Sequence, residues 1–491
     1  MTAAPIGEGR VTLAAFAGLV AGGGPVRLSP AARERMSAAL AIVEARAAGP
    51  EPVYGINTGL GAKLAERIPD DDIPAFQRRF VLGRAVGAGA PLPEATGRAV
   101  AIARLVSAAN GPAALSPPMA DHLCALLEAG LSPVVPEFGS IGAADLTQLA
   151  VWALGALGEG EVWRAGEILP AARTFAEAGL AAPRLGPRDG LALASHSGLS
   201  VALAADALAR AAAALDAAKA ALLLSYAGYD ANRAILEPEV NALRPAPGQA
   251  EAAAWLRERL AGTAHAPRRI QEALSFRQAA PVTGAAEDAL ARAVAVWEDE
   301  ANGTPDSPVV LSDGAMASTP NFHAPALALA LEGVALAMAM AGQGAVQRMQ
   351  RMMSPALSGL PRDLSPEGGA AAGMVPLQKT AAALLAEIRR HAQTAIFDPA
   401  PVSEGVEDMG CLTPLAARKL CDQMRAFRLL AGAEALVAAQ AIDLRGGSLG
   451  APVARLHEAL RARILPLGAD RPLGREIETA AQVLDEGAAR L

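Results

Sequence analysis

The sequence predicts an all-α fold in which long helices form a central bundle and a smaller mixed lobe precedes them. Of the 491 residues, 52% are hydrophobic but only 3% are aromatic. Alanine and leucine, both strong helix formers, therefore supply most of the apolar content, whereas sheets would require more valine, isoleucine and aromatic residues. The chain is also long enough to bury a large core and to form more than one lobe.

The helical patterns change in character along the chain. Up to about residue 182, short helices alternate with Gly- and Pro-rich connections, and the predicted N-terminal lobe spans residues 1–190. The predicted bundle with the C-terminal helices spans 191–491, and its polar end, from Glu458 onward, predicts a helical segment at the surface. Its long apolar helices are expected at 199–224, 324–353, 376–394 and 415–441.

These helices are apolar on most faces, so they must be buried on most faces. One chain offers few partners for them, and a bundle shared between subunits solves this problem. The sequence therefore predicts a homo-oligomer. Glu332 interrupts the most apolar segment, 324–342, which favours a buried helix over a membrane span.

Charge and cysteine content exclude several classes of function. The formal net charge of −7 is modest, and the scattered basic residues with few aromatics give little support for nucleic-acid binding. We recognise no signal peptide at the N-terminus. The three cysteines, Cys124, Cys411 and Cys421, are too sparse for a disulfide framework and predict reduced thiols and a cytoplasmic location. No Cys/His spacing predicts a metal site.

A glycine-rich loop, Val53-Tyr-Gly-Ile-Asn-Thr-Gly-Leu-Gly61, is long and specific. It resembles the Y-G-V-N-T-G-F-G loop of the histidine/aromatic amino acid ammonia-lyase family. The resemblance covers nearly the whole chain in the family's order. It implies a long central helical bundle of the ammonia-lyase/fumarase–aspartase type and a homotetrameric assembly.

A second segment, Gly139-Ser-Ile-Gly-Ala-Ala-Asp-Leu146, is similar to the family signature G-S-V-G-A-S-G-D-L. In the family, Ala-Ser-Gly cyclises into an electrophilic methylidene-imidazolone. Here Ala143, Ala144 and Asp145 follow one another, one residue short and without the serine. We therefore expect no methylidene-imidazolone and no other cofactor.

Further segments match the family with substitutions around the same site. Gly83-Arg84 replaces Ser-His, Ser195 replaces a supporting asparagine, and His196 replaces a glycine. The segment Gln271-Glu-Ala-Leu-Ser-Phe-Arg277 resembles Q-D-x-Y-S-L-R, with Leu274 in place of the second tyrosine. Weaker matches occur at Asn302, Asp306-Ser-Pro308, Asn321-Phe-His323, Ser358-Gly-Leu-Pro361 and Val406-Glu-Asp408.

The resemblance assigns roles to these positions. Tyr54 is implied as the catalytic base, which requires a phenol pKa lowered by nearby cations, and Glu407 as a carboxylate that faces the substrate amine. Arg277 is implied to hold the α-carboxylate as a bidentate pair, and Arg84 to read the far end of the substrate side chain. Other substrate-binding positions implied are Asn57, Ser195, His196 and Leu274.

Each residue also has a structural alternative. Tyr54 can be a turn residue beside Gly55, and either arginine can serve as an ion-pair partner. The run from Glu404 to Asp408 reads as the acidic opening of a helix. The Gly139–Gly142 segment can be an anion-binding nest, or only a turn with Asp145 as helix cap.

The predicted function is a carbon–nitrogen lyase that eliminates an amine from an amino-acid-like substrate. Without the electrophile, either the substrate carries a better leaving group or a more acidic β-proton, or the enzyme stabilises a carbanion-like intermediate. One rival is an ergothionase-like elimination of trimethylamine from a betaine. Two others are a non-catalytic scaffold that keeps the lyase fold and histidine ammonia-lyase activity proper.

Overall fold

The computed structural model describes residues 5–22, 25–59, 66–396 and 401–488, and the chain folds as two compact units. Neither unit is contiguous in sequence. The first unit consists of Met1–Asp206, Val294–Leu329 and Ala395–Arg418. The second consists of Ala207–Ala293, Ala330–Thr394 and Lys419–Leu491. The sequence division near residue 190 remains a prediction about organisation along the chain.

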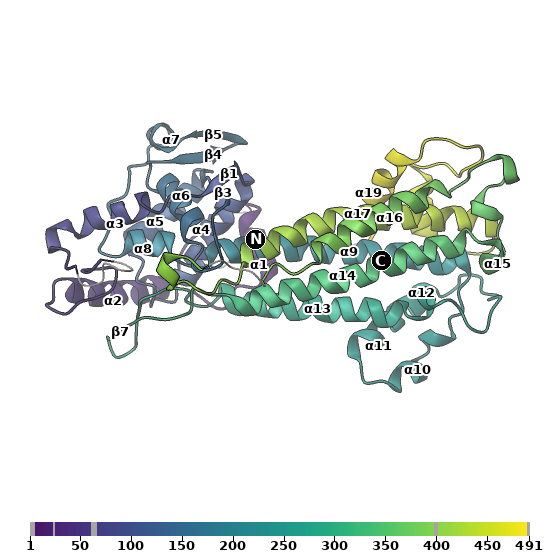
Figure 1. The fold of residues 1–491 in the computed structure, drawn as a ribbon, viewed down its shortest axis with the longest axis horizontal. Helices are drawn as coiled ribbons and strands as arrows, with labels where there is room; N and C mark the ends of the chain where they lie inside the picture. Colours follow the sequence, from purple (N-terminus) through teal and green to yellow (C-terminus); the bar gives the residue numbers. More distant parts are fainter. Residues whose placement is uncertain (1–4, 23–24, 60–65, 397–400, 489–491) are drawn as a thin grey trace. The chain divides into compact units, whose positions relative to one another are not determined.

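Helices dominate both units, and the all-α prediction is confirmed (Figure 1). Four long helices each contribute residues to both units: α9 (Gly198–Tyr229), α13 (Ala279–Ala301), α14 (Pro325–Met352) and α17 (Thr413–Arg445). The predicted long helices correspond to α9, α14, α17 and α16 (Pro376–His391). Their observed ends differ from the predicted ends by a few residues, as expected where helix termini carry little sequence signal.

Short helices and strand pairs make up the rest of the first unit. Its helices are α1 (Leu13–Val20), α2 (Pro30–Ala47), α3 (Ile73–Leu82), α4 (Glu94–Ala108), α5 (Pro117–Glu128), α6 (Leu146–Ala156), α7 (Ala171–Ala178) and α8 (Asp189–Ala194), with 3-10 turns η2 (Asp70–Asp72) and η6 (Ser403–Gly405). Its strands are β1 (Ala88–Pro91), β2 (Ser132–Pro133), β3 (Pro136–Phe138), β4 (Glu161–Arg164), β5 (Glu167–Pro170), β6 (Val309–Val310) and β7 (Met316–Ala317). They pair antiparallel as β1–β3, β2–β4–β5 and β6–β7, with Val162 opposite Leu169 in the longest ladder.

The second unit adds shorter helices to the long ones. These are α10 (Pro238–Ala242), α11 (Pro247–Arg259), α12 (Leu274–Arg277), α15 (Pro355–Ser358), α18 (Ala451–Arg461) and α19 (Gly474–Ala488), with 3-10 turns η3 (Ala234–Leu236), η4 (Arg362–Leu364) and η5 (Gly368–Ala370). The segment from residue 458 onward is only partly a surface segment, because Ile477, Ala480 and Leu484 of α19 are buried.

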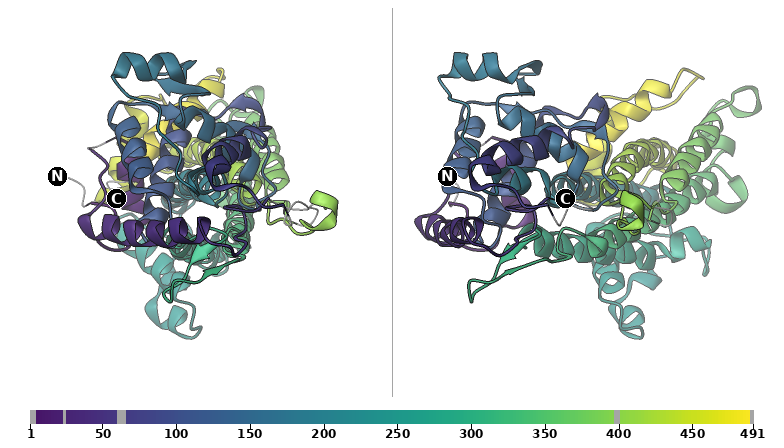
Figure 2. Two further views of the ribbon diagram at one scale, coloured as in Figure 1. Left: turned by 90° about the vertical axis from the view of Figure 1, so that its left-hand side faces the viewer. Right: turned by 60° about the vertical axis from the view of Figure 1, so that its left-hand side comes forward.

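Within the second unit the long helices lie side by side and are joined by buried polar contacts (Figure 2). Glu434 of α17 accepts hydrogen bonds from Ser225 of α9 (2.7 Å) and from Nε and Nη2 of Arg348 of α14 (2.6 and 2.9 Å). The backbones also approach closely, because a Cβ added to Gly228 of α9 would lie 2.7 Å from the carbonyl oxygen of Ala438. A larger residue at Gly228 would push α9 and α17 apart.

Two helical stretches are long and apolar enough to cross a membrane, residues 189–229 and Pro325–Met352. In the first, 72% of the most apolar window is buried within the structure, which is the behaviour of a core helix. In α14 only 44% of that window is buried. Helix α14 therefore presents apolar side chains that the described residues do not cover.

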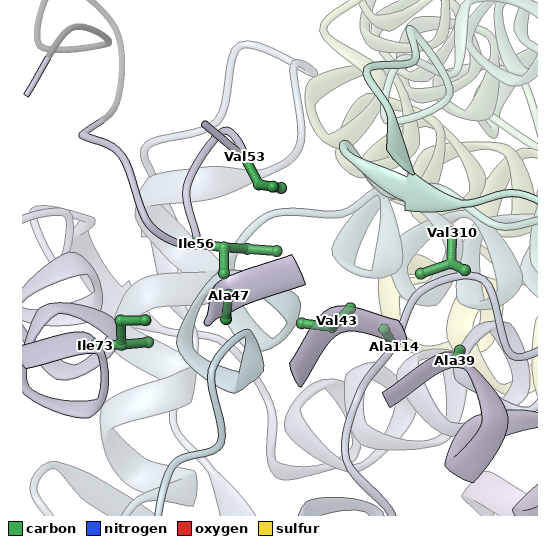
Figure 3. Close-up of a cluster of buried hydrophobic side chains, with 8 residues drawn as sticks. All are labelled: Ala39, Val43, Ala47, Val53, Ile56, Ile73, Ala114 and Val310. Carbon is green, nitrogen blue, oxygen red and sulfur yellow. The ribbon is translucent and has the colours of Figure 1, made fainter. Parts of the chain in front are cut away.

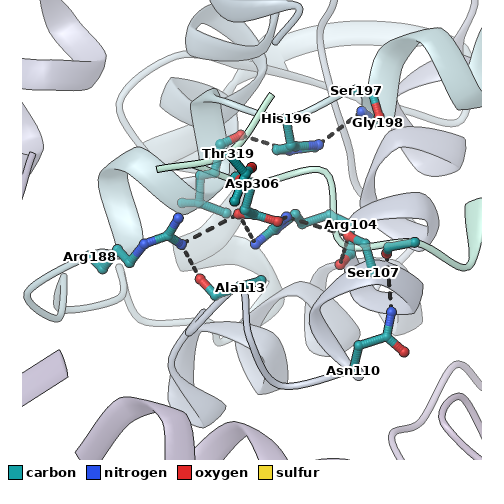
Figure 4. Close-up of polar contacts among 12 residues, drawn as sticks. Arg104, Ser107, Asn110, Ala113, Arg188, His196, Ser197, Gly198, Asp306 and Thr319 are labelled. Carbon is teal, nitrogen blue, oxygen red and sulfur yellow. Dashed lines mark hydrogen bonds and ion pairs between the residues drawn. The ribbon is translucent and has the colours of Figure 1, made fainter. Parts of the chain in front are cut away.

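An ion cluster at the centre of the first unit joins three distant segments (Figure 4). Asp306 receives two hydrogen bonds from Arg104 of α4, both 3.0 Å, and lies 3.4 Å from Nη1 of Arg188, just before α8. All three side chains are at most 1% exposed. Burial alone would raise the pKa of Asp306, but the two arginines outweigh it and hold that pKa below its usual value.

We predict that Asp306→Asn destabilises the protein by roughly 3–5 kcal/mol, because it leaves two buried guanidinium groups without a counter-charge. Denaturant unfolding measures the change. The matched control is Asp299→Asn, since Asp299 pairs with Arg10 at the surface, where the side chains are 75% and 60% exposed. That control should cost at most about 1 kcal/mol. Equal effects of the two variants would contradict the prediction.

Candidate active site

The loop that carries Tyr54 is fixed by buried neighbours on either side of the tyrosine. Val53 and Ile56 belong to an apolar cluster that includes buried residues of α2 (Figure 3). Tyr54 itself is partly exposed. The cluster consists of Ala39, Val43, Ala47, Val53, Ile56, Ile73, Ala114 and Val310. Gly55 adopts a left-handed conformation (φ 68°), which glycine reaches without steric cost. The loop thus presents a tyrosine from an anchored backbone. Gly61, at its end, lies outside the described residues.

The side-chain amides of two buried residues, Asn57 and Gln77, hold this loop. Asn57 accepts a hydrogen bond from the Val53 amide (2.7 Å), and its Nδ2 donates to the Glu51 carbonyl oxygen (2.9 Å), with longer contacts to carbonyls at the end of α2. These contacts make Asn57 a loop anchor, and its assignment to substrate binding remains a prediction. Gln77 of α3 donates to the Gly55 carbonyl (3.0 Å) and accepts from the Leu191 amide (3.0 Å). Gln77 therefore couples the Tyr54 loop to α8.

Arg84 follows α3 and is half-buried. Its guanidinium lies over the ring of Phe80, 4.1 Å from the centroid, and makes a long contact with the Phe80 carbonyl. Among the described residues no carboxylate forms an ion pair with it. Burial lowers the pKa of Arg84, while the charges of Tyr54 and Glu407 raise it. Two further predicted site residues, Tyr54 and Glu407, therefore each lie within electrostatic range of Arg84.

The segment in place of the family's electrophile is a tight turn. Gly142, Ala144 and Asp145 all have positive φ (77°, 64° and 47°), an unusual conformation for the two residues with side chains. The amide of Ala144 donates to the Phe322 carbonyl (3.2 Å), and its carbonyl accepts from the His196 amide (3.0 Å). Both peptide groups of Ala144 are therefore engaged with neighbouring segments.

Asp145 is buried and holds the turn through its carboxylate. It accepts hydrogen bonds from the Ser140 hydroxyl (2.7 Å) and from the amide and hydroxyl of Ser200 (2.7 and 3.1 Å). Burial raises the pKa of Asp145, and these hydrogen bonds oppose that rise. Asp145 precedes α6, but its side chain does not cap α6; it caps the first turn of α9 instead.

Ser195 and His196 follow α8, and their surroundings differ. Ser195 is partly exposed, whereas His196 is fully buried beside the Arg104–Asp306–Arg188 cluster (Figure 4). Nδ1 of His196 accepts from the Gly198 amide (2.9 Å), so Nε2 carries the proton and donates to the Leu193 carbonyl (3.2 Å). Both ring nitrogens thus support the backbone, and binding of substrate by His196 remains a prediction.

Glu407 lies on an exposed turn before α17. Its amide and carbonyl pair with Val402, and its side chain is exposed. The expectation that the acidic run opens a helix is wrong, because α17 begins only at Thr413. Helix-dipole stabilisation, which acts within the first turn, therefore does not explain the position of Glu407.

The remaining predicted residues, Arg277 and Leu274, belong to the second unit. Both lie on the single turn of α12, where Leu274 is 57% exposed and Arg277 is partly buried. Nη1 and Nη2 of Arg277 donate to the side-chain oxygen of Gln271 (2.7 and 3.1 Å) in the amide orientation that satisfies both groups. In the described part of the chain no carboxylate pairs with Arg277, so its two-donor edge is held by a neutral acceptor that a carboxylate could replace.

Sequence reasoning assigned no role to Gln77, Ser140 and Ser200. Each is polar and holds a site segment through side-chain hydrogen bonds. Gln77 could have been noticed as a polar residue at a core position of α3, where Phe80 and Val81 are buried. The serines carry no comparable signal, because serine is common in turns.

Comparisons with known proteins agree on the family. The family model described as aromatic amino acid lyase matches residues 11–462. A histidine ammonia-lyase of Anaeromyxobacter dehalogenans is 38% identical over 98% of each chain. Among solved structures, ergothionase from Treponema denticola, in complex with desmethyl-ergothioneine sulfonic acid, has a TM-score of 0.94 at 28% identity and 99% coverage of each chain. Histidine ammonia-lyase from Trypanosoma cruzi has a TM-score of 0.91 at 28% identity, covering 99% of this chain and 94% of that one.

We predict that His196 makes stability depend on pH. Burial, with a further contribution from Arg104, lowers its pKa from 6.5 to about 3. Below pH 6.5 the unfolded chain binds a proton that the folded chain does not. The free energy of unfolding should therefore decrease as the pH is lowered, by up to roughly 1.4 kcal/mol per pH unit. Denaturant unfolding of wild type and His196→Gln between about pH 7 and pH 4 isolates this slope. Identical slopes in the two proteins would refute it.

Proposed function

Because the chain belongs to the aromatic amino acid lyase family, we propose that it is a carbon–nitrogen lyase that works without a methylidene-imidazolone. It eliminates an amine and a β-proton from an amino-acid-like substrate and releases an unsaturated acid. The proposal rests on Arg84, a half-buried cation over the Phe80 ring that no carboxylate of the described residues neutralises and whose pKa responds to the charges of Tyr54 and Glu407.

The residues at the electrophile position do not fit the ring that the family forms there. The ring's exocyclic methylidene requires a side chain that can lose water, and neither Ala143 nor Ala144 has a leaving group. The nitrogen that would close a ring after Ala144 belongs to Asp145, whose carboxylate is tied to Ser140 and Ser200. We therefore route no step of the reaction through that group.

Without the electrophile, the charged side chains of the site must stabilise the transition state. Tyr54 acts as the general base in this proposal. Arg84 contributes to selection of the substrate side chain, for which a half-buried cation suits an anionic or strongly accepting group. Glu407 faces the departing amine. These roles require positive charge near the developing carbanion and negative charge near the amine, which is the pattern that electrostatic catalysis needs.

Arg277 binds the α-carboxylate in this proposal. Its Nη1 and Nη2 atoms already share one acceptor, the Gln271 side chain, so a carboxylate with two oxygens would satisfy them better. Leu274, Ser195, His196 and Asn57 are the other residues predicted to bind substrate. Leu274 offers an apolar surface where the family has a second tyrosine.

The assembly we propose is a cytoplasmic homotetramer. Leu329, Leu336 and Met340 of α14 are 59%, 60% and 57% exposed, and their spacing places them along one stripe of the helix. Burying such a stripe against further copies of the chain stabilises the assembly by removing apolar surface from water. The partners are further copies of the chain and a small-molecule substrate, not a nucleic acid or a membrane.

A second candidate is an ergothionase-like elimination of trimethylamine from a betaine. The structural similarity to ergothionase favours it, and so does the chemistry, because a tertiary amine leaves a quaternary centre without electrophilic help. A non-catalytic scaffold and histidine ammonia-lyase activity proper are weaker candidates. The absent serine argues against the latter, and retention of Tyr54 and Arg277 argues against the former.

We predict that Tyr54→Phe lowers kcat by about 10²–10⁴-fold on whichever substrate is turned over, because the general base is lost. A panel of amino acids and betaines, followed by the absorbance of the new conjugated alkene, first identifies that substrate. Tyr229→Phe is the matched control, since Tyr229 is a buried tyrosine of the second unit outside the proposed site. Unchanged turnover by Tyr54→Phe would refute the base assignment, and no turnover across the panel would favour the scaffold.

Mass spectrometry tests the missing electrophile and the assembly on one sample. We expect the denatured chain to have the full mass of its sequence, with no loss of water, and the native protein to have four times that mass. A denatured mass lower by whole water molecules, located to residues 142–145 by peptide mapping, would show that a ring forms after all. A monomeric native mass would refute the tetramer.

A further inference from the structure

A polar cavity in the second unit is lined by none of the residues assigned above to the proposed reaction. It has a volume of about 340 Å³. Its walls come from the end of α9, the end of α17 and the segment 263–268. The residues with ionisable side chains that line it are Asp230, His265, Arg268 and Arg445.

Asp230 builds the wall of this cavity and has little capacity left for a ligand. Its backbone is left-handed (φ 58°), which turns the chain at the end of α9. Oδ1 accepts from Nδ1 of His265 (3.0 Å), and Oδ2 accepts from the Ala266 amide (3.0 Å). Its negative charge is therefore used to hold the segment that carries His265 and Arg268.

Arg445 is held rigidly by carbonyl groups alone. Nε donates to Gly228 (2.9 Å), and Nη2 donates to Tyr229 (3.1 Å) and Ser358 (2.8 Å). In the described part of the chain its Nη1 has no hydrogen-bond partner, and no carboxylate pairs with the group. Burial lowers the pKa of Arg445, the nearby Arg268 lowers it further, and Asp230 raises it.

Arg268 lies against the same turn that Arg445 contacts. A Cβ added to Gly359 would lie 2.3 Å from Nη1 of Arg268, so the guanidinium packs directly on this glycine. Among the described residues Arg268 has no hydrogen-bond or ion-pair partner. Two guanidinium groups thus lie against the Ser358–Gly359 turn, where their charges repel each other and Asp230 offsets part of the charge of Arg445.

We infer that this cavity binds a small oxyanion of the phosphate or carboxylate type, held between Arg268 and Arg445. Planar guanidinium groups match the oxygens of such anions, and the ligand would relieve the repulsion between the two arginines. The volume suits a small anion with its waters. The inference concerns a site distinct from the proposed reaction and does not depend on it.

Calorimetric titration of the full-length protein with inorganic phosphate, and in parallel with malonate, tests the site. We expect at least one of the two anions to bind and to raise the melting temperature, and Arg268→Gln to weaken that binding at least about tenfold. Arg269→Gln is the matched control, because this adjacent exposed arginine donates to the Ala356 carbonyl and does not line the cavity. The control should bind like wild type.

Three outcomes would overturn the inference. The first is that neither anion binds the wild-type protein. The second is that Arg268→Gln binds the anion as tightly as wild type does. The third is that binding survives in Arg268→Gln but is lost in Arg84→Gln or Arg277→Gln, which would place the anion at the proposed active site. A loss confined to Arg268→Gln supports the cavity whether or not the protein proves to be a lyase.

Discussion

The first unit depends on one buried carboxylate, Asp306, which neutralises Arg104 and Arg188. These residues come from α4, from the start of α8 and from the segment before β6, so a single charge holds three distant parts of the chain together. The cluster also lies beside His196, whose pKa is lowered to about 3 by burial, with a further contribution from Arg104. A buried ion cluster is weak evidence for net stability, but here it fixes the segments on which the Tyr54 loop and the altered turn are built.

The altered turn keeps its shape without the residues that define the family's chemistry. Ala144 is held through both of its peptide groups, and Asp145 ties the turn to the first turn of α9. Loss of the serine has therefore not left a disordered remnant. An ordered turn at this position agrees with the proposal that the site has changed its chemistry, since a decayed site would have no reason to retain these contacts.

Much of the fold could be predicted from the sequence, but less of the site. The alanine- and leucine-rich runs predicted α9, α14, α16 and α17, because long apolar helices have a strong local sequence pattern. The two compact units could not be foreseen, since long-range packing has no local signal. For the same reason Asn57 and His196 were assigned to substrate, although in the structure their polar atoms bind backbone. A motif match identifies a position, but it does not show whether the side chain there binds a ligand or supports the backbone.

The discontinuous units have a consequence for how this protein could exchange parts with its relatives. Four of the five boundaries between the units fall inside helices α9, α13, α14 and α17. A genetic crossover near codon 190 would take Arg104, Arg188, Tyr54 and Arg84 from one parent but Asp306 and Glu407 from the other. Such chimeras keep the buried ion cluster only if both parents carry Arg104, Arg188 and Asp306. A change at one of these positions therefore requires matching changes in distant segments of the chain.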